Sequence, residues 1–161
     1  MSTETQIFRV YIKASPEAIF EALTSADWSE RYGYRGRNEF ELIKGGKYEG
    51  HATAEMTAQG APELMVKGEV LEYDPFTRFA HTQHFQWSPD IIEEGPSTIT
   101  YDIEPQQANG LTKLTVTHTG GPLHATAVAG EGALHEAGGG LPFILSDLKS
   151  LLESGKSLAD A

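Results

Sequence analysis

Residues Leu141–Ser154 read LPFILSDLKSLLES, and the fold of the rest of the chain follows from the helix that this stretch predicts. Its apolar side chains recur at helical spacing and form one stripe, made of Leu141, Ile144, Leu145, Leu148, Leu151 and Leu152. Pro142 suits a first helical turn, and Gly155 suits the position just after the last turn. Because packing of an apolar face stabilises most protein helices more than intrinsic propensity does, the stripe predicts a broad apolar surface beneath the helix.

The sequence between Glu39 and Thr119 supplies that surface, because its hydrophobic period there is mostly two. One predicted strand, for example, places on a single side the residues Phe79, His81, Gln83, Phe85 and Trp87. Asn109-Gly110 is a strong signal for a hairpin turn. We therefore predict several antiparallel strands in this region.

Segments near the N-terminus complete the outline. After a frayed terminus at residues 1–5, a first strand is predicted at Ile7–Ile12. Ser15-Pro16-Glu17 combines a capping hydroxyl, a proline and an acid, which marks the start of a short helix. Asp27–Tyr32 is predicted as a second short helix. The predicted fold class is α+β, with a curved antiparallel sheet wrapped around the C-terminal helix.

Three other segments carry specific expectations. Tyr48–Met56 is predicted to be one strand, with the small residues Gly50, Ala52 and Ala54 on its inner side. The segment that holds Pro89, Gly95 and Pro96 is predicted to be a loop. A helix is expected within Ala125–Ala137, followed by a break at Gly138–Gly140.

The composition predicts one globular domain over residues 1–161, with 39% apolar and 22% charged residues. The absence of cysteine excludes disulfides and thiolate chemistry. A net charge of −11 argues against nucleic acid and against an anionic membrane surface as partners. No apolar run approaches the roughly 20 residues needed to span a bilayer, and the N-terminus lacks a signal-peptide core, so a cytoplasmic protein is expected.

Short motifs along nearly the whole chain resemble one known family. In order, they are Ser15-Pro16-Glu17 with Ala22-Leu23-Thr24, Gly45-Gly46-Lys47-Tyr48, Gly68-Glu69-Val70-Leu71-Glu72 with Asp74-Pro75 and Arg78, Pro96-Ser97 to Thr100-Tyr101, Leu114-Thr115-Val116-Thr117-His118, and Leu145 to Glu153. Together they resemble the START-like (SRPBCC) superfamily, in the branch similar to the activator of the ninety-kDa heat shock protein ATPase.

The resemblance implies the helix-grip fold. In that fold a sheet of about seven strands holds the long C-terminal helix, and two short helices follow the first strand. It also implies a cavity between helix and sheet, which in related branches holds lipids, steroids or polyketide-like molecules.

Polar side chains on the apolar sides of the predicted strands point to such a cavity, and small residues on a facing strand would leave it space. We therefore hypothesise a ligand pocket lined by Trp28, Tyr48, Met56, His81, Phe85, Tyr101, His118 and Leu145. The alternative is that the polar groups are hydrogen-bonded core residues and that the glycines serve sheet curvature.

The predicted function is non-catalytic binding of a small, largely apolar ligand, such as a lipid, steroid or polyketide-like molecule, without a cofactor. The alternative is a co-chaperone-type module acting on a heat shock protein ATPase, and a homodimer is a further partner prediction. A third possibility is a cyclase- or hydrolase-like enzyme that uses His81 or His118 as acid–base group, although no carboxylate is placed to orient either. No metal site is predicted, because the spacing of His118, His124 and His135 matches neither a helical i, i+4 pair nor a known zinc-finger pattern.

Overall fold

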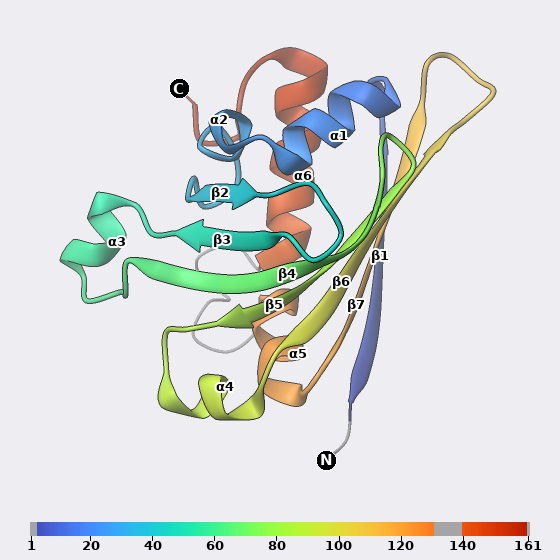
Figure 1. The fold of residues 1–161 in the computed structure, drawn as a ribbon. Coiled ribbons are helices and arrows are strands. Elements are labelled where there is room, and N and C mark those ends of the chain that lie inside the picture. Colours follow the sequence, from blue (N-terminus) through green and yellow to red (C-terminus); the bar gives the residue numbers. More distant parts are fainter. Residues whose placement is uncertain (1–2, 131–139, 161) are drawn as a thin grey trace.

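An antiparallel sheet with one long helix across its hollow side forms the centre of the computed structural model (Figure 1). The structure describes residues 3–130 and 140–160. In chain order the elements are β1 (Glu4–Ile12), α1 (Pro16–Thr24), α2 (Ala26–Ser29), β2 (Arg37–Phe40), β3 (Lys47–His51), α3 (Ala54–Ala58), β4 (Leu64–Asp74), β5 (Arg78–Phe85), α4 (Pro89–Glu94), β6 (Ser97–Pro105), β7 (Thr112–Gly120), α5 (Pro122–Ala129) and α6 (Gly140–Ser154).

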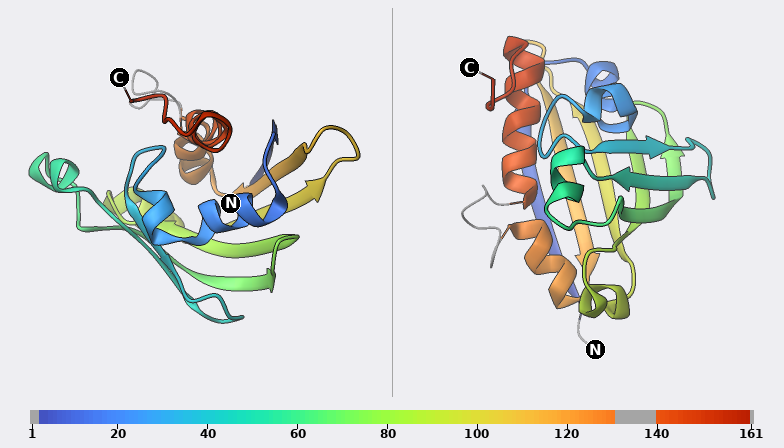
Figure 2. Two further views of the ribbon diagram at one scale, coloured as in Figure 1. Left: turned by 90° about the horizontal axis from the view of Figure 1, so that it is seen from above. Right: turned by 90° about the vertical axis from the view of Figure 1, so that its left-hand side faces the viewer.

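The seven strands pair antiparallel in the order β1-β7-β6-β5-β4-β3-β2. β1 pairs with β7 along its full length, from Glu4 opposite Gly120 to Ile12 opposite Thr112. Figure 2 shows that the sheet curves and that α6 lies across its concave side. These observations confirm the predicted α+β class and the helix-grip arrangement.

The stripe on α6 packs on the sheet as its spacing predicts. Four of its leucines are buried, namely Leu141, Leu145, Leu148 and Leu151, and the two remaining stripe residues pack against the same core. The sheet side of that core includes Ile103, Leu114 and Val116, each no more than 2% exposed. Neither α6 nor any other helix in the described part of the chain is long and apolar enough to cross a membrane.

Two predictions of local structure are wrong. Residues Ala54–Ala58 form α3 instead of continuing β3, because the Thr53 hydroxyl accepts the Met56 N–H at 3.1 Å and caps a helical turn. Residues Pro89–Glu94 form α4 instead of a loop, and Ser88 caps that helix in the same way. Each helix thus begins with the hydroxyl cap that correctly predicted α1 at Ser15.

Several boundaries differ from those expected. The second short helix covers Ala26–Ser29 and not Asp27–Tyr32. β1 already begins at Glu4, where residues 1–5 were expected to fray, because its pairing with β7 extends that far. α5 begins at Pro122, ahead of the predicted Ala125, and Gly138 and Gly139 lie outside the described residues.

Gly68 brings two strands together and does not open space. A Cβ at Gly68 would lie 1.9 Å from the backbone oxygen of Thr82 on β5, so only glycine permits this approach. The β4–β5 register shifts close by, between Val70 and Glu72. Gly68 therefore serves the packing of the sheet, the alternative given for the glycines in the sequence analysis. Gly50, in contrast, lines the cavity described next.

Candidate functional site

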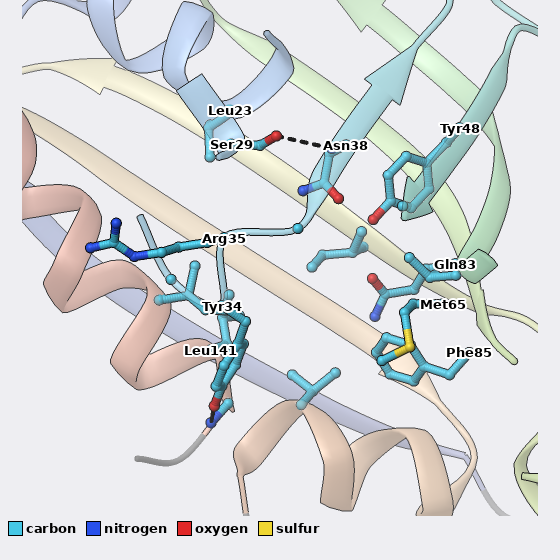
Figure 3. Close-up of a pocket in the computed structure, with 18 of the residues that line it drawn as sticks. Leu23, Ser29, Tyr34, Arg35, Asn38, Tyr48, Met65, Gln83, Phe85 and Leu141 are labelled. Carbon is cyan, nitrogen blue, oxygen red and sulfur yellow. Dashed lines mark hydrogen bonds between the residues drawn. The ribbon is translucent and has the colours of Figure 1, made fainter. Parts of the chain in front are cut away.

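A cavity of about 420 Å³ lies between the concave side of the sheet and α6 (Figure 3). Its apolar wall is made mainly of Leu23, Phe40, Met65, Val66, Phe85, Ile99, Leu141, Ile144, Leu145 and Leu148. The volume and the apolar wall are those of a typical small-molecule site.

The loop between α2 and β2 closes one side of the cavity and is fixed by a buried carboxylate on α6. Asp147 is fully buried and accepts hydrogen bonds from the backbone N–H of Gly33 (2.8 Å), the Ser157 hydroxyl (2.9 Å) and the backbone N–H of Leu158 (2.6 Å). Arg35 extends this network, since its guanidinium donates to Ser157 Oγ at 2.9 Å. One carboxylate therefore connects α6, a cavity-lining loop and the C-terminal segment.

Four polar side chains on the sheet side of the cavity make no side-chain hydrogen bond to another of the described residues, namely Asn38, Tyr48, Gln83 and Tyr101. Their polar atoms are not enclosed by protein, because the one enclosed side-chain nitrogen or oxygen without a partner among the described residues is His81 Nε2. The Tyr32 hydroxyl, by contrast, donates to the backbone oxygen of Ala22 at 2.9 Å. Burial raises the pKa of both Tyr48 and Tyr101, so their hydroxyls stay protonated at neutral pH.

The structure brings five of the eight predicted site residues into the cavity wall: Tyr48, Met56, Phe85, Tyr101 and Leu145. Trp28, His81 and His118 do not line it. Trp28 instead donates its indole N–H to Glu21 at 3.0 Å and carries the Arg31 guanidinium over its ring. Trp28 belongs to α2, next to the loop that lines the cavity, but its ring is turned toward α1.

His81 lies behind the cavity wall. It is 1% exposed, and its ring centroid lies 4.4 Å from that of Tyr48 and 5.9 Å from that of Tyr101. Nδ1 is 2.8 Å from the backbone oxygen of Thr82 and so carries the proton, while Nε2 has no partner among the described residues. Burial lowers the pKa of His81 to about 4, so the imidazole is neutral at physiological pH.

His118 is also enclosed, in a hydrogen-bonded cluster between β1, β6 and β7. Its ring nitrogens lie 3.0 Å from Gln6 Oε1 and 2.9 Å from Ser97 Oγ, and the side chain is fully buried. Burial, together with the nearby His124, lowers the pKa of His118 to about 4. Because neither histidine reaches the cavity, the geometry gives no support to acid–base catalysis by His81 or His118 on a cavity ligand.

A buried acid–histidine pair next to the cavity was not predicted. Glu94, 6% exposed, contacts His124 Nδ1 and also accepts the backbone N–H groups of Leu123 (2.7 Å) and His124 (2.9 Å) at the start of α5. His124 Nε2 accepts the Phe85 N–H at 3.3 Å, which assigns the proton of the neutral ring to Nδ1.

Opposing effects act on the pKa values of this pair. Burial raises the pKa of Glu94, but the hydrogen bonds from His124 and from the Leu123 and His124 N–H groups outweigh it, so the pKa is lowered. Burial lowers the pKa of His124 against the opposing effect of Glu94. The pair holds α5 and Phe85, two parts of the cavity wall, in fixed positions.

One group of side chains in the described residues has metal-ligand spacing, on the surface of β2 and β3. Donor atoms of Glu39, Glu49 and His51 lie within 4.8 Å of one another. His51 Nε2 is 3.3 Å from Glu39 and 3.8 Å from Glu49, and Arg37 also pairs with Glu39. Arg37 and His51 thus already contact these carboxylates, and nothing in the arrangement requires a cation.

The sequence pattern of the family described as "Activator of Hsp90 ATPase homolog 1-like protein" matches residues 13–153. No curated protein matches the chain.

Solved structures share the fold at low sequence identity. Protein MLL2253 from Mesorhizobium loti is 21% identical, with a TM-score of 0.68 over 98% of this chain and 100% of its own. CalU16 from Micromonospora echinospora is 17% identical, with a TM-score of 0.65 over 97% of this chain and 78% of its own. The Aha1 dimer from Colwellia psychrerythraea is 20% identical, with a TM-score of 0.61 over 98% of this chain and 100% of its own. With the motif order, the fold and the family match in agreement, the chain belongs to the Activator of Hsp90 ATPase homolog 1-like protein family.

Proposed function

We propose that the protein binds a small, largely apolar molecule in the cavity between the sheet and α6, without catalysing its conversion. The observation that carries this proposal is the cavity of about 420 Å³, whose wall is mostly apolar and includes polar side chains that have no protein partner among the described residues. Protein interiors are normally close-packed, with few voids larger than a water molecule. A bound molecule would fill this cavity and pair with the polar groups that face it.

Native mass spectrometry of protein purified from its own cells, followed by solvent extraction, tests this proposal. We expect a stoichiometric apolar adduct on the wild type and its loss from Ala127→Phe, because Ala127 lines the cavity and the added ring would occupy it. Ala108→Phe is the matched control, since Ala108 is exposed between β6 and β7. A clean unliganded mass, with no thermal stabilisation by a lipid and polyketide panel, would contradict ligand binding.

A second candidate is a protein-interaction role on a heat shock protein ATPase, and the family match over residues 13–153 favours it. Adding the protein to an Hsp90-type ATPase and measuring turnover distinguishes the two roles. Stimulation that persists in Ala127→Phe would favour the interaction role, because the substituted side chain lies in the cavity wall. Stimulation that depends on an open cavity would connect the two roles.

Self-association is a further proposal about partners. A solved relative from Colwellia psychrerythraea, 20% identical, is described as a dimer. Light scattering coupled to size-exclusion chromatography is expected to give twice the 17.5 kDa chain mass if this protein also pairs. A constant mass of one chain at all concentrations would contradict a homodimer.

A further inference from the structure

We propose that the cavity selects an uncharged ligand that presents a hydroxyl or carbonyl group to the sheet, with Tyr48 and Gln83 as specificity-determining residues. This inference rests on the ligand-binding function proposed above. It adds the charge, the hydrogen-bonding groups and the orientation of the ligand.

The cavity wall divides into a polar side and an apolar side. The polar side chains without protein partners come from strands: Asn38 on β2, Tyr48 on β3, Gln83 on β5 and Tyr101 on β6. Figure 3 shows Asn38, Tyr48 and Gln83 on the sheet side of the cavity, across from Leu141. A ligand that fits both sides therefore has a polar edge toward the sheet and an apolar edge toward the helix.

The side chains that α6 itself contributes to the wall are all apolar, namely Leu141, Ile144, Leu145 and Leu148. Next to them, the Tyr34 hydroxyl already accepts the Gly140 N–H at 2.9 Å (Figure 3). A polar substituent turned toward the α6 side chains would lose its hydrogen bonds to water without replacement, which is strongly unfavourable. The wall thus fixes the orientation of the ligand as well as its polarity.

The charges along the wall favour a neutral ligand. Among the described lining residues none is Asp, Glu or Lys. Arg35 and His51 line the wall, but each already faces a carboxylate, Arg35 that of Asp160 at 3.4 Å and His51 that of Glu39 at 3.3 Å. A ligand carboxylate or ammonium at the polar side would be buried without a counter-charge, which is costly.

The hydrogen-bonding groups on the polar side both donate and accept. A protonated tyrosine hydroxyl donates one hydrogen and accepts at its oxygen, and the Gln83 and Asn38 amides supply both functions as well. Burial keeps the Tyr48 and Tyr101 hydroxyls protonated. A ligand hydroxyl or carbonyl matches this set, whereas a pure hydrocarbon leaves all of these groups unpaired.

Three probes of equal ring size test the inference: naphthalene, 2-naphthol and 2-naphthoate, titrated into the full chain at pH 7 and followed by NMR chemical shifts. We expect 2-naphthol to bind about 3- to 10-fold more tightly than naphthalene, the factor for one net hydrogen bond. We expect 2-naphthoate to bind at least about 10-fold more weakly than 2-naphthol, because its charge would be buried unpaired.

Conservative variants identify the residues that give this preference. Tyr48→Phe and Gln83→Met are expected to bring the affinity for 2-naphthol down to that for naphthalene. Both should fold, because the removed atoms face the cavity and make no side-chain hydrogen bond to another of the described residues. Tyr11→Phe is the control, since Tyr11 is 49% exposed outside the cavity and its substitution should leave all three affinities unchanged.

Other outcomes overturn the inference in distinguishable ways. Equal affinity for naphthalene and 2-naphthol in the wild type, blocked by Ala127→Phe, overturns the polar selection and leaves cavity binding intact. Tightest binding of 2-naphthoate overturns it too and makes Arg35 the recognising group. Binding of none of the probes, combined with a clean unliganded mass from cells, overturns the inference and the proposed function together.

Discussion

Replacing Asp147 with alanine is expected to lower the free energy of unfolding by about 3–5 kcal/mol. The Asp147 carboxylate is fully buried, and its removal leaves the Gly33 N–H, the Leu158 N–H and the Ser157 hydroxyl without their acceptor. Each unsatisfied buried donor costs about 1–3 kcal/mol, and relaxation or entering water reduces the sum. Chemical denaturation followed by circular dichroism measures the change, and thermal unfolding should show a midpoint lowered by about 10–15 °C.

Two further variants separate the role of the carboxylate from a general effect on α6. Ser146→Ala changes the neighbouring exposed residue, whose hydroxyl donates to the Pro142 oxygen of the same helix, and should alter stability by less than about 0.5 kcal/mol. Asp147→Asn keeps the shape but replaces one acceptor oxygen with a donor, so an intermediate loss is expected. A loss below about 1 kcal/mol for Asp147→Ala would contradict the anchoring role.

The architecture could be predicted because its signals are local and periodic. The stripe on α6 and the alternation in β5 each follow from the sequence spacing of one element, and burial of that face selects one register. The errors at α3 and α4 have a different origin. In α3 the small residues Ala54 and Ala58 suit a helix as well as a strand face, and the Thr53 cap decides between them. In α4 the sequence Ser88-Pro89-Asp90 repeats the cap signal of α1, so this helix was predictable.

The burial of Asp147 could not be predicted, because it depends on a contact made by another segment. Helical spacing places Asp147 on the polar side of α6, where solvent is the default neighbour. The residues from Ser157 to Asp160 fold back onto that side, and the Ser157 hydroxyl and the Leu158 N–H donate to Asp147. Gly33 supplies the third donor. The Glu94–His124 pair is equally non-local, since its members are brought together by the packing of α4 on α5.

The residues of the candidate site also fall into a group that the sequence predicts and a group that it does not. Strand alternation places Tyr48, Phe85 and Tyr101 on the concave side, and the structure puts them in the cavity wall. The same alternation also places His81 and His118 on the inner face of the sheet. Alternation predicts the face of the sheet on which a side chain lies, but not whether that side chain reaches the cavity. Both rings lie in layers behind the wall, where neighbouring aromatic and amide side chains enclose them.

Their burial makes the stability of the fold depend on pH. His81 and His118 both have pKa values lowered by burial to about 4, against about 6.5 in an unfolded chain. Below pH 6.5 the unfolded state therefore binds more protons than the folded state, and folding loses stability as the pH falls toward 4. Each histidine contributes a slope of up to about 1.4 kcal/mol per pH unit in this range.

We expect the free energy of unfolding to be about 3–4 kcal/mol lower at pH 5 than at pH 7.5, a large part of the stability of an ordinary domain. Urea unfolding at several pH values measures this slope. In His81→Phe the slope between pH 6 and 4.5 should fall, by up to about 1.4 kcal/mol per pH unit, because one of the histidines whose pKa is lowered by burial no longer takes up a proton. Carboxylates with lowered pKa values, such as Glu94, act at lower pH, because their folded-state stabilisation is lost only as they protonate. An unchanged free energy between pH 7.5 and 5 in the wild type would contradict the neutral, enclosed state of both histidines.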